Sequence, residues 1–252
     1  MFTDTHCHIL STSYYNPEDI IQNLNDNNIK RVIINGYNYQ TNKEVINLSN
    51  KYSNVYGAIG IHPDNINDNE ISLTIDLINQ NLNNPKIIAL GEIGLDYYHN
   101  KENKEEQLKL LDTFLTLSEK YHISVIIHNR DATDDLLKLL KKHHTKGIIH
   151  CFSGSIETAK EYIKLGYKLG IGGVLTFKNS KLKEVLKEIP INNILLETDS
   201  PYLTPSPLRG LPNEPMYLKF IADELINIYN LSIPDISTIL EQNFLDTFDI
   251  KN

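Results

Sequence analysis

The stretches Ser124-Val125-Ile126-Ile127-His128 and Gly147-Ile148-Ile149-His150 repeat one pattern, a short apolar run that ends in a histidine. Between them, segment 131–142 has the residue spacing of an amphipathic helix. Short, continuously apolar runs are typical of strands that are covered on both faces, as in parallel sheets. The whole stretch therefore predicts a strand–helix–strand unit with a polar side chain at the end of each strand.

The same alternation extends along the chain in both directions. Strand-length apolar runs are expected at 2–8, 31–34, 55–61, 86–90, 124–127, 147–149, 168–171 and 193–196. Helical spacing is found in segments 17–28, 105–121, 131–142, 155–165, 182–188, 215–229 and 234–248. About eight repeats of strand and helix predict an α/β fold of the (β/α)8 TIM barrel type, with a doubly wound open sheet as the alternative. A length of 252 residues suits a single domain, 1–252, of this kind.

The composition narrows the class of protein. The net charge of −8 argues against broad electrostatic binding to duplex DNA, although bound cations could supply positive charge locally. Two cysteines, Cys7 and Cys151, are too few for a disulfide framework, and we expect both to be reduced and not to bind metal. The sequence has no signal-peptide pattern and no apolar run that could span a bilayer, so we expect a cytoplasmic monomer without membrane contact.

The segment Asp4-Thr5-His6-Cys7-His8 suggests a metal site. Alternate side chains of a strand point to the same side, so His6 and His8 could converge on one cation while Cys7 points away. Two incidental histidines at a polar strand end would explain the segment about as well. The prediction therefore depends on the residue types at the ends of the other strands.

Four further strand ends carry candidate ligands. Glu92 and Asp199 supply carboxylates, and His128 and His150 supply imidazoles. Each of these residues alone has an ordinary structural role as its alternative, such as a salt bridge, a capping group or a hydrogen-bonded core histidine. Barrel enzymes, however, place their functional groups at the carboxyl ends of the strands. Together with His6 and His8 they are too many ligands for one tetrahedral ion, and two divalent ions (Zn, Mg or Mn) bridged by a carboxylate would use them better.

At this point the chain resembles the TatD family of metal-dependent deoxyribonucleases. The resemblance rests on motifs in the right order along nearly the whole chain: Thr3-Asp4-Thr5-His6-Cys7-His8, Gly60-Ile61-His62-Pro63, Gly91-Glu92-Ile93-Gly94-Leu95-Asp96-Tyr97-Tyr98, Ile127-His128-Asn129-Arg130, His150-Cys151-Phe152-Ser153-Gly154 and Glu197-Thr198-Asp199-Ser200-Pro201. It implies an amidohydrolase-like barrel with a site for two metal ions. His6 and His8 would hold the first ion and His128 and His150 the second. Glu92 would bridge both ions. Asp199 would complete the ligand shell of the first ion and act as general base.

The resemblance makes a deoxyribonuclease the leading functional hypothesis, with single-stranded DNA or DNA ends as the substrate. Local recognition of a few nucleotides suits an acidic protein better than tracking along a duplex. Candidate contacts to the substrate lie just past expected strand ends: His62, Arg130, Lys178 and Arg209. Each of these could instead be a surface cation or, for His62, a structural residue.

Two other functions stay open at this point. The first is an amidohydrolase-type hydrolase of another bond, such as an amide, a lactone or an aminoacyl-tRNA ester. A lysine in the seventh strand, serving as a carbamate bridge, would favour amide chemistry, and 169–174 contains none. The second is a binding scaffold with a vestigial site, which the complete set of ligands argues against.

Overall fold

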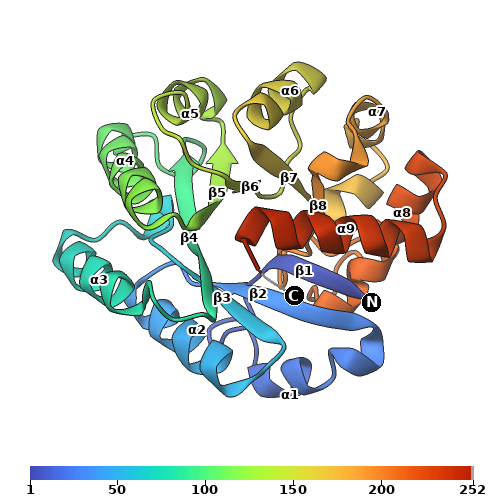
Figure 1. The fold of residues 1–252 in the computed structure, drawn as a ribbon, viewed down its shortest axis with the longest axis horizontal. Coiled ribbons are helices and arrows are strands. Elements are labelled where there is room, and N and C mark those ends of the chain that lie inside the picture. Colours follow the sequence, from blue (N-terminus) through green and yellow to red (C-terminus); the bar gives the residue numbers. More distant parts are fainter. Residues whose placement is uncertain (251–252) are drawn as a thin grey trace.

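The computed structural model describes residues 1–250 and contains an eight-stranded parallel sheet rolled into a barrel (Figure 1). The strands are β1 (Phe2–Cys7), β2 (Ile29–Asn35), β3 (Val55–Ile59), β4 (Ile87–Asp96), β5 (Ser124–Arg130), β6 (Gly147–Ile149), β7 (Tyr167–Ile171) and β8 (Ile194–Leu196). Neighbours in the chain are neighbours in the sheet. The barrel closes where the Asp199 amide donates to His6 O (2.9 Å) and the His8 amide to Ser200 O (2.7 Å). The expected (β/α)8 TIM barrel is confirmed, and the open sheet is excluded.

Helices surround the barrel. They are α1 (Pro17–Gln22), α2 (Tyr39–Lys51), α3 (Asp68–Asn81), α4 (Lys104–Tyr121), α5 (Thr133–Leu140), α6 (Ile156–Lys164), α7 (Leu182–Lys187), α8 (Leu218–Tyr229) and α9 (Ile233–Phe248). Figure 1 shows α9 crossing the end of the barrel that faces the viewer. Its residues Phe244, Leu245 and Phe248 pack against the apolar side chains of the barrel interior, so this helix covers the amino-terminal end of the strands.

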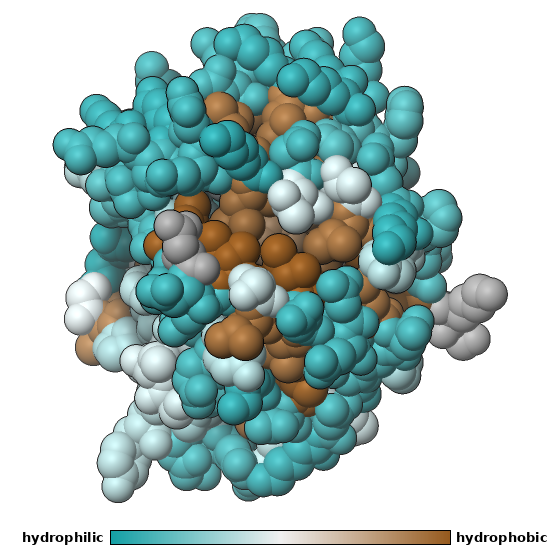
Figure 2. Space-filling view, turned by 90° about the vertical axis from the view of Figure 1, so that its left-hand side faces the viewer, coloured by the Kyte–Doolittle hydropathy of each residue, from teal (hydrophilic) through white to brown (hydrophobic). Residues whose placement is uncertain are grey.

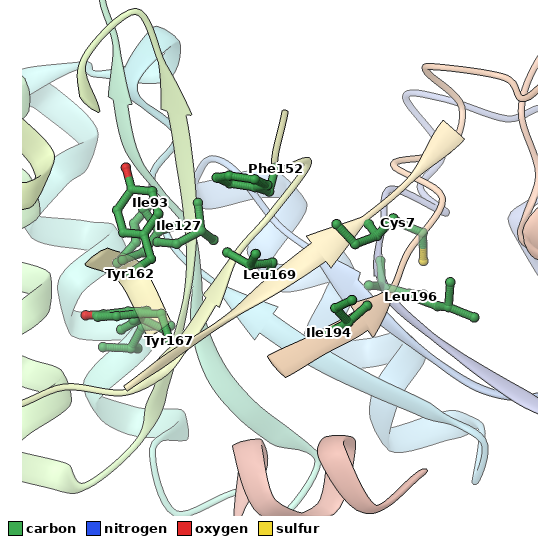
Figure 3. Close-up of a cluster of buried hydrophobic side chains, with 14 of the residues drawn as sticks. Cys7, Ile93, Ile127, Phe152, Tyr162, Tyr167, Leu169, Ile194 and Leu196 are labelled. Atoms are coloured by element: carbon green, nitrogen blue, oxygen red, sulfur yellow. The ribbon is translucent and has the colours of Figure 1, made fainter. Parts of the chain in front are cut away.

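Two layers of apolar side chains hold the fold together. The outer layer lies between strands and helices and includes Val125, Ile127 and Ile149, together with the side chains drawn in Figure 3. The inner layer fills the barrel and includes Ile126 and Ile148. Because side chains alternate along a strand, the inner row continues two residues later at the next inward position. The interior of β5 and β6 therefore passes from isoleucine to histidine toward the carboxyl ends.

The structure differs from the sequence-based expectations mainly in two helices, α2 and α3, which the sequence did not predict. Helix α2 buries Thr41, Asn42 and Ser49 beside Val45 and Leu48, so its buried face is half polar and its apolar spacing is weak. Helix α3 is rich in asparagine and has a poor intrinsic preference for helix. The segment expected as one helix at 17–28 is instead α1 followed by a short 3-10 turn at Asn25–Asn27.

The surface is mostly hydrophilic, as Figure 2 shows for one side of the molecule, with a hydrophobic patch at the centre of that side. Exposed apolar residues such as Leu73 of α3 are found on this otherwise polar exterior. Among the described helices, none combines the length and the apolar character needed to cross a membrane.

Candidate metal centre

The candidate ligands lie together at the carboxyl ends of the strands. A cleft of about 530 Å³ opens there, and its walls include five of the six expected ligands: His8, Glu92, His128, His150 and Asp199. The sixth, His6, lies below the floor of the cleft and is fully buried. Asp199 follows β8 with a left-handed φ of 56°, a conformation that aspartate tolerates better than most residues. Residues that are far apart in the sequence thus meet where the barrel geometry predicts.

His6 and His8 form the first half of the site. Their Nε2 atoms are 3.2 Å apart. Glu92 Oε2 lies 3.5 Å from His6 Nε2 and 3.3 Å from His8 Nε2. Asp199 Oδ1 lies 3.5 Å and 3.7 Å from the same two nitrogens. Two imidazoles and two carboxylates therefore point at one small volume.

His128 and His150 form the second half, on the other side of Glu92. His128 Nδ1 and His150 Nε2 are 3.1 Å apart. Glu92 Oε1 lies 3.1 Å from His128 Nδ1 and 2.9 Å from His150 Nε2. Glu92 thus turns one carboxylate oxygen toward each histidine pair. Burial alone would raise the pKa of Glu92, but His150, His62 and His6 outweigh this effect and hold the pKa well below its ordinary value.

The hydrogen bonds behind the site indicate which nitrogens carry lone pairs. His8 Nδ1 lies 2.9 Å from Asn35 O, which can only accept, so the proton is on Nδ1 and the lone pair is on Nε2. His128 Nε2 lies 3.1 Å from Asp96 Oδ2, so its lone pair is on Nδ1, which faces Glu92 Oε1. A lone pair facing a carboxylate oxygen at this distance needs a proton or a cation between them. The donor set of imidazoles and carboxylates fits divalent cations.

Two buried carboxylates behind the histidines, Asp96 and Glu197, were not assigned a role from the sequence. Asp96 Oδ2 accepts from His128, and its Oδ1 accepts from the amides of Tyr98 and His99. Glu197 is fully buried beside His150, with Oε1 3.6 Å from His150 Nδ1. A carboxylate that accepts a hydrogen bond from a metal-binding histidine orients its ring, and Asp96 is placed to do this for His128. Glu197 Oε1 instead accepts from the Cys151 amide. Glu197 follows the inward alternation of β8 after Leu195, a signal that could have identified it from the sequence.

Of the four residues expected to contact the substrate, all within the described part of the chain, two line the cleft and two do not. His62 and Arg130 line the cleft. Arg209 stacks over the Phe177 ring at 4.2 Å and donates to Thr204 O. Its guanidinium therefore holds the segment between Thr204 and Arg209 against Phe177. Lys178 is exposed and is not among the described residues of the cleft wall. Roles for these four residues remain predictions.

His62 has a defined hydrogen-bonding state. Its Nδ1 accepts from the Asp64 amide (3.1 Å), so the proton is on Nε2, which lies 3.6 Å from Glu92 Oε1. Burial lowers the pKa of His62 to about 3. At neutral pH it is therefore an uncharged donor that points into the site.

Both cysteines were expected to be reduced and not to bind metal. Both are free, and Cys7 is buried in the outer apolar layer (Figure 3). The Cys7 thiol lies 3.3 Å from Ile33 O. Neither cysteine belongs to a group of potential metal ligands among residues 1–250.

Comparison with known proteins decides the family. A family model described as "TatD related DNase" matches residues 3–249. The chain belongs to the TatD family. It is 37% identical over 257 residues to "Uncharacterized metal-dependent hydrolase YabD" of Bacillus subtilis, with 100% of both chains covered. The family resemblance seen in the sequence and the metal-dependent hydrolase class are thereby confirmed.

Solved structures agree with this assignment. A crystal structure of YjjV, a TatD homolog from Escherichia coli K12, superposes with a TM-score of 0.91 at 30% identity and covers 99% of this chain and 98% of that one. An uncharacterized amidohydrolase from Saccharomyces cerevisiae superposes with a TM-score of 0.86 at 16% identity, over 98% of this chain and 99% of that one. The second likeness concerns the fold alone, which is an amidohydrolase-like barrel.

Proposed function

We propose that this TatD-family protein is a deoxyribonuclease that uses two divalent cations to hydrolyse phosphodiester bonds. The observation that carries the proposal is the position of Glu92, whose two carboxylate oxygens face two separate histidine pairs. One carboxylate between two sets of ligands is the arrangement expected for a two-metal site. The family description, a TatD related DNase, supports DNA as the substrate.

The ligands divide between the two positions. His6, His8 and Asp199 would hold one cation and His128 and His150 the other, with Glu92 shared. When bound, zinc, magnesium or manganese ions supply an acidified water and neutralise negative charge at phosphorus. All six ligands come from one chain, so the site is complete in a monomer.

Asp199 is the proposed proton acceptor. Burial would raise the pKa of Asp199, but hydrogen bonding to His6 and the charges of nearby histidines lower it, so the carboxylate is ionised at neutral pH. Its side chain remains partly accessible from the cleft (13% exposed), unlike the fully buried His6. Asp199 can therefore meet an attacking water and take its proton as the new phosphorus–oxygen bond forms and the ester P–O bond breaks, with the departing oxygen leaving as an alcohol once it is protonated.

His62 and Arg130 are the proposed contacts to the phosphate. The His62 Nε2–H points toward the space beside Glu92 and can donate to a non-bridging phosphate oxygen. Arg130 lines the cleft with its guanidinium stacked over the Tyr98 ring at 4.1 Å, which orients the guanidinium. So few cationic groups suit a short segment of single strand or a DNA end rather than a long duplex.

The decisive experiment couples metal content to cleavage. Purified protein is analysed for bound metal and then given end-labelled single-stranded DNA, duplex DNA and RNA with magnesium, manganese or zinc. We expect about two equivalents of metal and shortening of the single strand. Protein that binds two metals yet leaves every phosphodiester intact would contradict the proposal.

Hydrolysis of another bond is the competing function, and one structural detail counts against its carbamate-bridged form. Lys168 is the lysine of β7, and its amine donates to Asn192 O on the exterior, 2.6 Å away. Parallel assays of a lactone and an aminoacyl-tRNA ester test this alternative directly.

A further inference from the structure

The lining of the cleft combines aromatic and polar groups. The wall beside His8 is aromatic: the Tyr37 and Tyr202 rings meet the His8 ring edge to face, with centroids 5.7 Å and 6.1 Å away. The lining of the cleft also includes charged and polar groups, such as Asp64 after β3 and Arg130 at the end of β5. A substrate in the cleft therefore meets an aromatic surface as well as polar groups.

Tyr202 is exposed although its backbone is firmly held. Its side chain is 59% exposed. Its amide donates to Asp199 O (2.8 Å), and its carbonyl accepts from Asn213 Nδ2 (2.6 Å). Asn213 is fully buried and also donates to Thr198 O, so it ties the loop to the segment that carries Asp199. The backbone of Tyr202 is thus held by hydrogen bonds while its ring is exposed to solvent.

Besides its edge-to-face contact with His8, no hydrogen bond holds the Tyr202 side chain among the described residues. Other tyrosines of the chain, such as Tyr14 and Tyr229, use their hydroxyls to bond backbone carbonyls. Within residues 1–250, the Tyr202 hydroxyl makes no hydrogen bond of this kind. Tyr37 differs too, because its hydroxyl is paired with Thr12 (2.9 Å). An aromatic ring that is held at the cleft, is 59% exposed and has no hydrogen bond to its hydroxyl among the described residues is suited to a flat ligand.

We propose that Tyr202 is the residue on which a nucleobase next to the scissile phosphate stacks, with Tyr37 as the adjoining wall. The inference rests on the proposed function and names what the site recognises besides phosphate. Bases stack on aromatic side chains with little dependence on sequence, because every base has a π-face. Because the protein has a net charge of −8, its overall charge does not attract the DNA phosphates. Stacking would supply affinity for the nucleic acid in place of that attraction.

The test compares two chromogenic esters that release the same leaving group. One is thymidine 5′-(p-nitrophenyl phosphate), and the other is methyl p-nitrophenyl phosphate, which has no nucleoside. The ratio of their kcat/KM values measures what the nucleoside contributes. We expect Tyr202→Ala to lower this ratio about 10-fold or more, Tyr202→Phe to preserve it, and KM to change more than kcat. Tyr121→Ala, which removes an exposed tyrosine far from the cleft at the end of α4, is the matched control and should leave the ratio unchanged.

A second readout does not depend on turnover. A single strand that carries terminal 2-aminopurine is bound to protein in an Asp199→Asn background with magnesium. Stacking quenches 2-aminopurine fluorescence, so quenching should persist with Tyr202 or Phe and be lost with Ala at this position. If Tyr202→Ala keeps both the ratio and the quenching while DNA is still cleaved, the inference is wrong and the proposed function stands. If the wild type cleaves neither DNA nor either ester, both the proposed function and the stacking inference are wrong.

Discussion

Glu92 connects the two halves of the site through its two carboxylate oxygens, and its replacement tests the shared site directly. We expect Glu92→Ala to reduce hydrolysis by more than the roughly 10–100-fold that loss of a supporting residue causes. The protein should still fold, because Glu92 belongs to neither of the two apolar layers. Turnover and circular dichroism of the variant are measured beside Glu241→Ala, which removes a carboxylate that pairs with Lys30 and Arg31 away from the cleft. Wild-type turnover in Glu92→Ala would remove this residue from the mechanism.

Asp199 has two proposed roles, ligand and proton acceptor, and one substitution can separate them. Asp199→Asn keeps the size of the side chain and an oxygen that can bind metal but removes the basic carboxylate. We expect a loss of about 10²–10⁴ in kcat from the missing general base. Metal content is measured on the same preparation. Full metal content with nearly unchanged kcat would make Asp199 a ligand only.

Asp96 acts on the second histidine pair through His128. Its Oδ2 holds the His128 Nε2 proton and so leaves Nδ1 free for metal. We expect Asp96→Asn to weaken binding of one cation by about 10–100-fold while the other is retained. Calorimetric titration of the metal-free protein measures both steps. Asp64→Asn is the control, because Asp64 approaches His99 (3.5 Å) as Asp96 does but, within residues 1–250, makes no hydrogen bond to His128. Equal weakening by both variants would argue against an orienting role.

The clustering of the candidate ligands could be predicted from the sequence, because most of them stand at the end of an apolar run of strand length. His128 and His150 lie two residues beyond Ile126 and Ile148, so the period of the strand alone places them inside the barrel. The contact between Asp96 and His128 could not be predicted in this way. It depends on the register of β4 against β5, which shifts between Leu90 and Ile93. A role for the exposed Tyr202 was not predicted either, since single surface aromatics are common.

At the scale of whole elements, strands were easier to predict than helices. Strands buried on both faces are continuously apolar and are recognisable in isolation. Helices α2 and α3 were missed because tertiary packing, rather than apolar spacing, determines them. In α2 the buried Asn42 bonds Gly60 through both ends of its amide, a long-range contact that no local pattern reveals.

His143 links α4 to the segment after α5 and makes stability depend on pH. Its Nε2 lies 2.9 Å from Asp112 and its Nδ1 3.1 Å from Glu119. Burial alone would lower the pKa of His143, but these two carboxylates outweigh it and raise the pKa above the ordinary 6.5. Because the pKa of His143 is higher in the folded than in the unfolded protein, protonated His143 stabilises the fold. This stabilisation is complete at pH values below the unfolded-state pKa and is lost as the pH rises through the folded-state pKa.

We therefore expect His143→Gln to lower the free energy of unfolding slightly at pH 6 and by less at pH 9, because exposed ion pairs contribute little. Urea denaturation at both pH values measures this. His144→Gln serves as the control, because the contact of residue 144 with Glu119 is made by its backbone amide. The same deficit at both pH values would mean that His143 contributes packing rather than charge.

At the scale of the molecule, the proposed metal site joins strands that are distant along the chain. The candidate ligands come from β1, β4 and β5, and from the segments just after β1, β6 and β8, so bound cations would cross-link the carboxyl end of the barrel. A ligand that binds only the folded state stabilises it by about 2.7 kcal/mol at 100 times its Kd. For a chain of this size, that corresponds to a rise in Tm of roughly 5–10 °C. We expect a chelator to remove this increment and added manganese or zinc to restore it, as measured by scanning calorimetry. In Glu92→Ala, which lacks the shared carboxylate, the shift should be much smaller. If the chelated and metal-loaded wild-type proteins unfold at the same temperature, the folded chain binds these ions no better than the unfolded chain does, and the six side chains are not a metal site.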